Sequence, residues 1–494
     1  MAFIGALDQG TTSSRFIIFD DQGSIAAQSQ KEHQQYLPVP GWVEHDAAEI
    51  WQKVEEVIAD ALHKAGISGS DLATIGITNQ RETIVAWDST TSEPLHHALV
   101  WQDVRTEEAL KSFAPADIAT ITAKTGLPLS PYFSASKLQW LLSNSPAVQA
   151  AQSAGHLKVG TIDSWLIWKL TGGVHKTDVT NASRTLLMNL ETLSWDEQLL
   201  SYFGVSKELL PEIVSSSEIF GTTLAHGVLG ATVPIAGVLG DQQAAMVGQL
   251  CFEPGDTKCT YGTGNFALVN TGTEIVRSSH GLLTTVCFKF GDQPARFALE
   301  GSVAVTGSAV QWLRDQLGII SASSEVEPLA RSVKDSAGVY FVPAFSGLFA
   351  PYWRSDARGV IVGLTRAATK AHIARAALEA IAYQTRDVIN VMASETGKSL
   401  KVLRVDGGIT QNELCMQMQS DILQMEISRP VVSETTALGA AYAAGLAVGV
   451  WKSPDELRTQ WKESRRWSPE SGSELATSGY ENWKRAIERT LNWV

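Results

Sequence analysis

The chain has few cysteines, and their spacing matches no familiar pattern. Its 494 residues include only Cys251, Cys259, Cys287 and Cys415, and none of them forms a Cys-x-x-Cys pair. This spacing signals neither a disulfide framework nor a structural zinc site. A reducing, cytoplasmic setting is therefore the expectation.

Long apolar runs are also missing. The longest, residues 437–451, is rich in alanine and glycine and is too short to span a bilayer comfortably, so we expect a buried helix there. The N-terminal sequence MAFIGALDQG has no basic region followed by an apolar stretch, so no signal peptide is expected. These features predict a chain that does not insert into a membrane.

Positive charge is in short supply. Lysine and arginine total 39 against 52 acidic residues, which leaves a net charge of −13. A chain this acidic is a poor general binder of nucleic acid, although backbone amides can still hold an anion locally. With 44% hydrophobic and 18% charged residues, the composition is that of a globular protein of two or three domains.

The two common glycine-rich nucleotide motifs are absent. Neither the P-loop pattern Gly-x-x-x-x-Gly-Lys-Ser/Thr nor the Rossmann pattern Gly-x-Gly-x-x-Gly occurs. Instead, ALDQGTTSSRFIIFD (residues 6–20) predicts a strand, a Gly/Thr/Ser turn and a second strand. Such a turn can form an anion nest, with Asp8 holding Mg²⁺ through water and Arg15 offsetting phosphate charge. The same residues also suit an ordinary hairpin with a solvated Asp8.

A second stretch repeats this pattern half a chain later. In DTKCTYGTGNFALVN (residues 256–270) the turn is Gly262-Thr263-Gly264, about 250 residues after the first. The repeat suggests two structurally related halves, and strands alternating with helical patterns indicate an α/β fold. A break near Pro254-Gly255 divides the chain into domains at 1–250 and 251–494, the second ending in a helical tail after Ser453.

The helical patterns have recognisable ends. One runs from an N-cap at Asp46 to Gly66, and a strand follows at 74–78. Further helices are expected at 303–318, at 372–392, from about Asn412, and after a cap at Ser433 or Thr435.

Several side chains could carry chemistry. Asp241 follows an apolar strand and could be either a helix N-cap or a base for phosphoryl transfer. Arg81 and Glu82 combine donors with acceptors, as a small polyol requires, but could equally be a surface ion pair. Trp101 and Tyr132 suit the wall of a polyol site, although buried aromatics usually belong to the core.

A glycine turn near residue 407 offers a surface for a flat ring. Gly407-Gly408 follows the strand in RVDGG, and the absence of side chains lets a base or ribose approach the backbone. Asn412 could bond that base or simply cap the next helix.

Together these stretches resemble the FGGY family of carbohydrate kinases, from residue 4 to about 451. The resemblance rests on LDQGTTSSR, PGWVEHD, IGITNQRET, VWQDVRT, PYFSASKLQW, TNASRT, GDQQAA, TYGTG, ALEG, RVDGG and TALGAAYAAGLAVG. Within the family, NQRE with WQDVR is typical of members that phosphorylate glycerol rather than xylulose, ribulose or gluconate. The resemblance implies two actin-like ATPase domains, each with a ribonuclease-H-like core, that close on ATP and substrate in an interdomain cleft.

The resemblance also assigns roles to individual residues. Asp241 matches the general base and Asp8 the magnesium-associated acid, and both are candidates to hold Mg²⁺. The implied nucleotide contacts are Thr11, Thr12, Ser13, Arg15, Thr263, Gly307, Gln311, Gly408 and Asn412. The implied substrate contacts are Arg81, Glu82, Trp101, Tyr132, Asp241, Gln242 and Phe266.

The expected reaction is ATP-dependent phosphorylation of glycerol to sn-glycerol 3-phosphate, in a homo-oligomer (dimer or tetramer). A kinase for another small polyol or sugar is the alternative; an actin-like filament or chaperone ATPase would not need Arg81, Glu82 or Phe266. The resemblance implies that some bacterial members are inhibited by fructose 1,6-bisphosphate, which binds a Gly/Arg loop in this region. Residues 224–237 contain no lysine or arginine, so such inhibition is not expected here. The resemblance also implies that other bacterial members are activated by phosphorylation of a histidine in this region. His226 is offset by about one residue from that position and lacks the flanking aromatic residues, so its phosphorylation is not expected.

Overall fold

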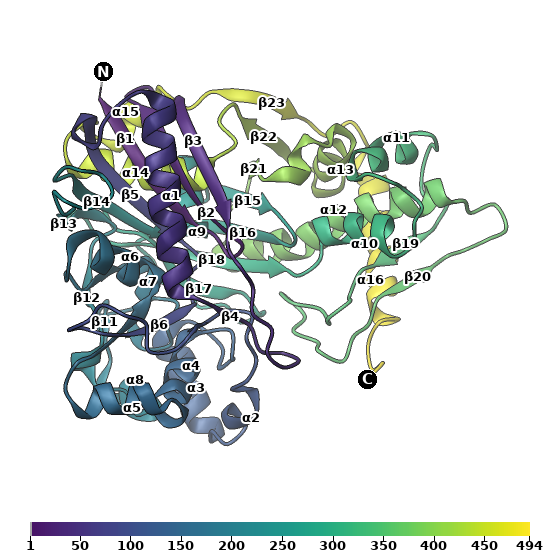
Figure 1. Cartoon of the computed structure of the whole chain (residues 1–494). Coiled ribbons are helices and arrows are strands. Elements are labelled where there is room, and N and C mark those ends of the chain that lie inside the picture. The colour runs from purple at the N-terminus through teal and green to yellow at the C-terminus, as the bar shows by residue number, and fades with distance from the viewer. Residues whose placement is uncertain (1) are drawn as a thin grey trace.

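Two mixed β-sheets organise the chain, and each belongs to one α/β domain (Figure 1). The computed structural model describes residues 2–494. The first sheet has the order β13 (Ser217–Thr222), β14 (Pro234–Gly240), β5 (Leu72–Asn79), β1 (Phe3–Gln9), β2 (Ser13–Asp20), β3 (Ile25–Glu32). The second has the order β17 (Leu283–Phe288), β18 (Arg296–Val303), β16 (Asn265–Gly272), β15 (Thr257–Tyr261), β21 (Val402–Asp406), β22 (Glu426–Pro430), β23 (Glu463–Trp467).

The two sheets repeat one pairing pattern. Each starts with an antiparallel hairpin, β1–β2 or β15–β16, and adds a third antiparallel strand, β3 or β18. The first strand of each hairpin then pairs in parallel with a later strand, β5 or β21, followed by a further parallel strand, β14 or β22. The prediction of two related halves is confirmed by this shared topology.

Helices fill the space between and around the sheets. α1 (Ala47–Ala65) and α6 (Ile162–Thr171) pack against strands of the first sheet, and α12 (Lys370–Thr396) packs on the second. α14 (Thr435–Ala447) packs on β1, β5 and β14 of the first sheet, although it comes from the second half of the chain (Figure 1). α9 (Asp241–Gly248) lies against α14 and contacts β15–β17.

Glycine permits the close packing of α9 and α14. A side chain at Gly439 would collide with the carbonyl of Ala244, and one at Gly248 would collide with the carbonyl of Thr435. The helices therefore meet backbone to backbone, which only residues without a Cβ allow. One hydrophobic core joins both helices to the inner faces of both sheets.

The remaining elements build the rim of the first domain and the outer parts of the second. A four-stranded sheet, β4-β7-β6-β8, lies beside the helices α2–α5 and α8 (Figure 1). The other strands are β4 (Glu44–His45), β6 (Ile84–Asp88), β7 (Ala98–Leu99), β8 (Leu157–Thr161), β9 (Lys176–Asp178), β10 (Met188–Asn189), β11 (Ser194–Trp195), β12 (Glu212–Val214), β19 (Tyr340–Val342) and β20 (Val360–Val362). The other helices are α2 (Glu107–Leu110), α3 (Pro115–Thr125), α4 (Ser134–Asn144), α5 (Pro146–Ser153), α7 (Val179–Ala182), α8 (Glu197–Phe203), α10 (Gly307–Asp315), α11 (Val326–Arg331), α13 (Glu413–Leu423), α15 (Pro454–Arg458) and α16 (Ser473–Glu488).

Some helix ends follow the sequence and others do not. The Asp46 side chain caps α1 through the amide of Ala48, and Gly66 ends the helix at φ 67°. The helix expected from residue 303 begins only at Gly307, because β18 runs through Val303. The N-cap of α14 is Glu434 rather than either flanking hydroxyl residue.

The C-terminal tail contains a strand as well as helices. β23 pairs antiparallel with β22 and extends the second sheet, so the expectation of a purely helical tail was wrong. Its sequence, ESRRW, alternates poorly and exposes four of five side chains, so its pairing comes from the neighbouring strand edge. Within residues 2–494, no helix is both long and apolar enough to span a membrane.

Candidate active site

The first Gly/Thr turn is held from behind by three other segments. The Gly10 carbonyl accepts a hydrogen bond from Gln80 Nε2 at 3.3 Å, and the Thr11 carbonyl accepts one from Gln35 Nε2 at 2.9 Å. The Trp101 indole donates to Thr11 Oγ1 at 2.9 Å. Thr12 is exposed at the tip. A turn fixed in this way has the rigid backbone that an anion nest needs.

A buried histidine orients the two glutamines. His45 is fully buried, with Nε2 2.7 Å from Gln35 Oε1 and Nδ1 3.3 Å from Gln80 Nε2. Burial lowers the pKa of His45 to about 3, so the ring is neutral at pH 7. The contacts then assign the tautomer: Nε2–H donates to Gln35, and Nδ1 accepts from Gln80.

The second turn rests on the start of α10. The amide of Gly307 donates to the Gly262 carbonyl at 3.1 Å, and the amide of Thr306 donates to the Thr263 carbonyl at 3.0 Å. A Cβ on Gly307 would lie 2.5 Å from the Gly262 oxygen, so the contact excludes every side chain. Thr263 is exposed at the tip, and Gln311 is exposed one helical turn after Gly307.

Asp8 and Arg15 face each other across the first hairpin. Burial, together with the nearby carboxylates of Asp241 and Glu434, raises the pKa of Asp8 to about 6, although Arg15 opposes this rise. The Arg15 guanidinium forms an ion pair with Glu434, at the N-terminus of α14. Ser13, by contrast, is buried and accepts a hydrogen bond from Gln30.

Asp241 is the first residue of α9, and Gly240 is the N-cap. Its Oδ1 atom accepts a hydrogen bond from the Gln242 amide at 2.7 Å and lies 3.2 Å from Arg81 Nε. One third of the side chain is exposed, so a ligand can reach it. Asp241 directly follows the carboxyl end of β14, and open α/β sheets bind their ligands at the carboxyl ends of the strands.

Arg81 and Glu82 are buried rather than on the surface. Their exposed fractions are 3% and 2%, so the surface ion-pair interpretation was wrong. Arg81 makes a bidentate pair with Glu300, and Glu82 accepts a hydrogen bond from Arg184 Nε at 2.7 Å. Arg184 also donates to Glu300 at 3.2 Å, which closes a ring of four buried charges.

Sequence reasoning missed Glu300 and Arg184. Burial alone would raise the pKa of Glu300, but the guanidiniums of Arg184 and Arg81 hold it at about 2. Glu300 lies on β18 of the second sheet, whereas both arginines come from the first half of the chain. Its signal was visible: a carboxylate within the apolar strand RFALEGSV is costly unless it is paired.

Trp101 and Tyr132 form an edge-to-face pair with ring centroids 5.3 Å apart. Both are half-buried, and burial raises the pKa of the Tyr132 phenol, which keeps it protonated. Through its bond to Thr11, Trp101 connects this aromatic wall with the first turn. Phe266 lies on β16, opposite Ser302 of β18, and packs against the core that the two sheets share.

The glycine turn after β21 is open on one side. Gly408 is exposed, and no atom lies within 4 Å of where its Cβ would be. Its neighbour Gly407 has φ 91° and sits against the Tyr261 backbone. Asn412 caps α13 through Oδ1, which accepts the amide of Cys415 at 2.8 Å.

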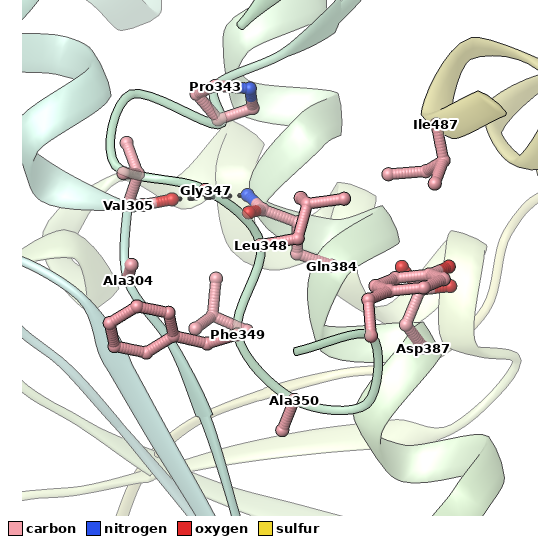
Figure 2. A pocket seen from close by; sticks show the side chains of 12 residues that line it. Ala304, Val305, Pro343, Gly347, Leu348, Phe349, Ala350, Gln384, Asp387 and Ile487 are labelled. Carbon is pink, nitrogen blue, oxygen red and sulfur yellow. Dashed lines mark hydrogen bonds between the residues drawn. The ribbon is translucent and has the colours of Figure 1, made fainter. Parts of the chain in front are cut away.

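The pocket in Figure 2 belongs to another part of the second domain. It lies under the loop from Pro343 to Tyr352, where Gln384 Nε2 donates to the Val305 carbonyl at 3.1 Å (Figure 2). Its volume of about 10 Å³ holds no more than one water molecule. None of the residues that line it is a site residue expected from the sequence.

The chain is similar to known carbohydrate kinases along most of its length. Models of the FGGY family of carbohydrate kinases match residues 3–248 (N-terminal domain) and 257–448 (C-terminal domain). Glycerol kinase 1 of Streptomyces coelicolor is 60% identical over 100% of this chain and 98% of its own length. Glycerol kinase of Mycobacterium tuberculosis is 57% identical over 100% and 96%.

Solved structures agree with the sequence relatives. The crystal structure of Plasmodium falciparum glycerol kinase with ADP has a TM-score of 0.93 and 40% identity, and covers 99% of this chain and 98% of its own. Gluconate kinase from Lactobacillus acidophilus, at 23% identity and a TM-score of 0.86, covers 99% and 97% and shares the fold. On these matches and the topology above, the chain belongs to the FGGY family of carbohydrate kinases.

Proposed function

We propose that the chain catalyses ATP-dependent phosphorylation of glycerol to sn-glycerol 3-phosphate. One observation carries the proposal: the buried Arg81–Glu82 pair, suited to a small polyol, lies directly beside Asp241, with Arg81 Nε 3.2 Å from the carboxylate. A donor-and-acceptor pair next to a reachable carboxylate is what recognition and deprotonation of a polyol require. The names of the relatives at 57–60% identity support the same substrate.

In the proposed reaction Arg81 and Glu82 hold the two hydroxyls that do not react. Asp241 orients the third hydroxyl and accepts its proton as the oxygen attacks the γ-phosphorus of ATP in line. The new oxygen–phosphorus bond forms while the bond from phosphorus to the bridging oxygen breaks, and ADP leaves with that electron pair. Trp101 and Tyr132 form a wall against the carbon chain of the substrate.

The two turns and the nearby glycine hold the nucleotide in this proposal. Amides and hydroxyls of Thr11, Thr12 and Ser13 face the phosphates from one domain, and Thr263 faces them from the other. The remaining contacts to the nucleotide are assigned to Arg15, Gly307, Gln311, Gly408 and Asn412. Arg15 must then exchange its partner Glu434 for phosphate, at least in part.

The residues present fit a magnesium ion. Asp8 and Asp241 are close enough for one carboxylate to raise the pKa of the other, and a cation between them relieves that repulsion. Oxygen ligands and retained waters are what Mg²⁺ prefers. When bound, the ion neutralises phosphate charge as it does in other phosphoryl-transfer enzymes. We propose Asp8 and Asp241 as the residues that hold it, directly or through water.

The deciding experiment measures ADP release from ATP with and without glycerol and identifies the product. Glycerol-dependent ADP release with formation of sn-glycerol 3-phosphate is the expected result. A panel of erythritol, xylulose, ribulose and gluconate covers the alternative of another small polyol or sugar. ADP release that ignores glycerol, or prefers a panel member, would contradict the proposed substrate.

Three further expectations belong with this proposal. The domains are expected to divide at 1–250 and 251–494, with α14 returning to the first. The enzyme is expected to act in the cytoplasm, where ATP is supplied. A homo-oligomer, either a dimer or a tetramer, is expected by analogy with the family, and light scattering on the purified chain measures it.

A further inference from the structure

Lys258 is a fully buried charge that the proposed mechanism leaves without a role. It is the second residue of β15, four residues before the second Gly/Thr turn, and its exposed fraction is 0%. Its ammonium group donates to Gln242 Oε1 and, at 2.9 Å, to Thr260 Oγ1. A buried lysine is costly and is kept only where its partners need it.

Lys258 and Asp241 together fix the direction in which the Gln242 amide points. An ammonium group has only donors, so the atom of Gln242 that faces it must be the carbonyl Oε1. The amide Nε2 is then turned toward Asp241, where it donates to Oδ2 at 3.2 Å. The Asp241 carboxylate only accepts hydrogen bonds, so it favours the same orientation from the other end of the amide.

The two oxygens of Asp241 are not equivalent as a result. Oδ1 accepts the Gln242 backbone amide at 2.7 Å and lies 3.2 Å from the positive charge of Arg81 at Nε. Among the hydrogen bonds of residues 2–494, Oδ2 accepts only the one from Gln242 Nε2. One lone pair of Oδ2 is left to accept the proton of a substrate hydroxyl.

We propose that Lys258 is a positioning residue that acts on Asp241 through Gln242, and that Oδ2 is the atom that takes the proton. This inference rests on the proposed function. The hydroxyl proton goes to Oδ2, the hydroxyl oxygen bonds to the γ-phosphorus, and the bond to the ADP oxygen breaks with its electron pair on ADP. Lys258 touches none of the reacting atoms in this role.

Lys258 contacts the Gln242 side chain from the second sheet. Lys258 belongs to the second sheet, whereas Gln242 and Asp241 belong to α9, which lies against that sheet. Burial lowers the pKa of Lys258, and the negative charges of Asp406, Asp241 and Glu300 oppose that change. The base is therefore oriented by the domain that carries the second phosphate turn, and only while that packing is intact.

The test is a double-mutant cycle on kcat with glycerol. Lys258→Met keeps the length of the side chain and removes its donors, and Gln242→Leu removes the amide. We expect Lys258→Met to lower kcat about 10- to 100-fold, within the range that general-base catalysis supplies, with KM for ATP changed less than about twofold. In the Gln242→Leu background the same change should lower kcat by less than about twofold.

Two outcomes of the cycle would overturn the proposal. Full additivity of the two changes would mean that Lys258 does not act through Gln242. A large rise in KM for ATP would mean that Lys258 touches the phosphates directly. Thr260→Val is the matched control: it removes the other hydrogen-bond partner of Lys258, and kcat should stay within about twofold of the parent chain.

A second variant keeps the proposal testable if Lys258→Met does not fold. Gln242→Glu retains an acceptor for Lys258 but places an oxygen, not an amide, against Oδ2. We expect the melting temperature to be kept and kcat to fall at least tenfold, because two carboxylates then face each other. Parental kcat in this variant would contradict the role of the amide.

A structural readout separates this inference from the choice of substrate. In a crystal structure of Lys258→Met, the Gln242 amide should leave Oδ2 of Asp241 or lose its single orientation. An unchanged contact would overturn the positioning role, whatever the enzyme phosphorylates. Absence of glycerol-dependent turnover in the parent chain would instead contradict the proposed function. The orientation of the Gln242 amide in the crystal structure would still test the positioning role.

Discussion

Arg81 and Glu300 face each other as a bidentate pair although 219 residues separate them, with Nη1–Oε2 at 2.5 Å and Nη2–Oε1 at 2.8 Å. Arg81 follows β5 of the first sheet, and Glu300 lies on β18 of the second sheet. The contact therefore connects the two domains at the proposed substrate site. It leaves Arg81 Nε directed at Asp241 and Glu82.

Glu300→Gln should weaken both the fold and substrate binding. Breaking a buried pair leaves uncompensated charge and costs about 3–5 kcal/mol, and here Arg81 and Arg184 both lose a carboxylate. We expect a melting temperature lower by several degrees and a KM for glycerol raised about tenfold or more. The control is Glu191→Gln, which breaks the exposed pair with Arg277 and should change neither quantity. An unchanged KM would show that Glu300 does not orient Arg81.

Asp241→Asn should remove turnover without unfolding the chain. The amide keeps an acceptor for the Gln242 backbone but cannot take a proton, so kcat should fall about 10²- to 10⁴-fold. The side chain is one-third exposed at a helix start, so the melting temperature should change little. Asp46→Asn, at the cap of α1, is the matched control and should leave kcat intact. Equal kcat in the two variants would rule out the base role.

Trp101→Phe should loosen the first turn while it keeps the aromatic wall. The change removes the donor to Thr11 Oγ1 but leaves a ring against Tyr132. A lost hydrogen bond of about 1 kcal/mol corresponds to a KM for ATP raised roughly fivefold. Thr11→Ser retains the hydroxyl and should behave like the parent chain. A change confined to KM for glycerol would place Trp101 in the polyol wall alone.

Gly408→Ala separates nucleotide approach from folding. Open space surrounds the position, so the extra methyl group should not lower the melting temperature. If the nucleotide lies against this backbone, the methyl group meets it and KM for ATP rises several-fold. Gly307→Ala is the contrasting variant: its Cβ would collide with the Gly262 carbonyl, so it should also disturb the second turn. A parental KM in Gly408→Ala would remove Gly408 from the nucleotide site.

Asp387 gives the fold a measurable pH dependence. Burial raises its pKa from 3.8 to about 6, against the lowering effect of hydrogen bonds from Trp483 and Tyr480. The folded state therefore holds this proton more tightly than the unfolded chain. The unfolded chain loses this proton near pH 4, whereas the folded protein loses it near pH 6. Between these values the free energy of unfolding falls by about 1.4 kcal/mol per pH unit, and above pH 6 the contribution of Asp387 is constant.

Asp387→Asn should abolish this contribution. The neutral amide can still accept from Trp483 and donate to the Tyr480 hydroxyl. The variant should match the parent near pH 4 and be more stable at pH 7. Melting temperatures of both proteins across pH 4–8 check this, since other buried carboxylates contribute equally to each. Parallel curves would show that Asp387 is already ionised in the folded state.

Most of the fold could be predicted from the sequence because the patterns that determine it are local. Two Gly/Thr hairpins, the Asp46 cap and the apolar strands depend on neighbours in sequence, and the structure contains each of them. β23 was missed because its pairing depends on the edge of β22, which no local pattern encodes. The pairing of Glu434 with Arg15 was missed for the same reason, since 419 residues separate the two.

The candidate site could be predicted only in part. Arg81, Glu82 and Asp241 stand in motifs whose chemistry suits a polyol and a phosphoryl group, and the structure brings them together. The residues that orient them, Glu300 and Lys258, come from strands of the other domain. Their only sequence signal is a charge inside an apolar strand, which tells that a partner exists but not which one.

The placement of α14 has a consequence for the order in which the chain can fold. All six strands of the first sheet lie before residue 241, yet the helix on one of its faces consists of residues 435–447. Side chains at Gly76 and Gly237 would collide with that helix, so the sheet is shaped for it alone. A growing polypeptide therefore has to extend past residue 447 before that face of the sheet is covered. Until then its apolar face is open to other nascent chains and to chaperones.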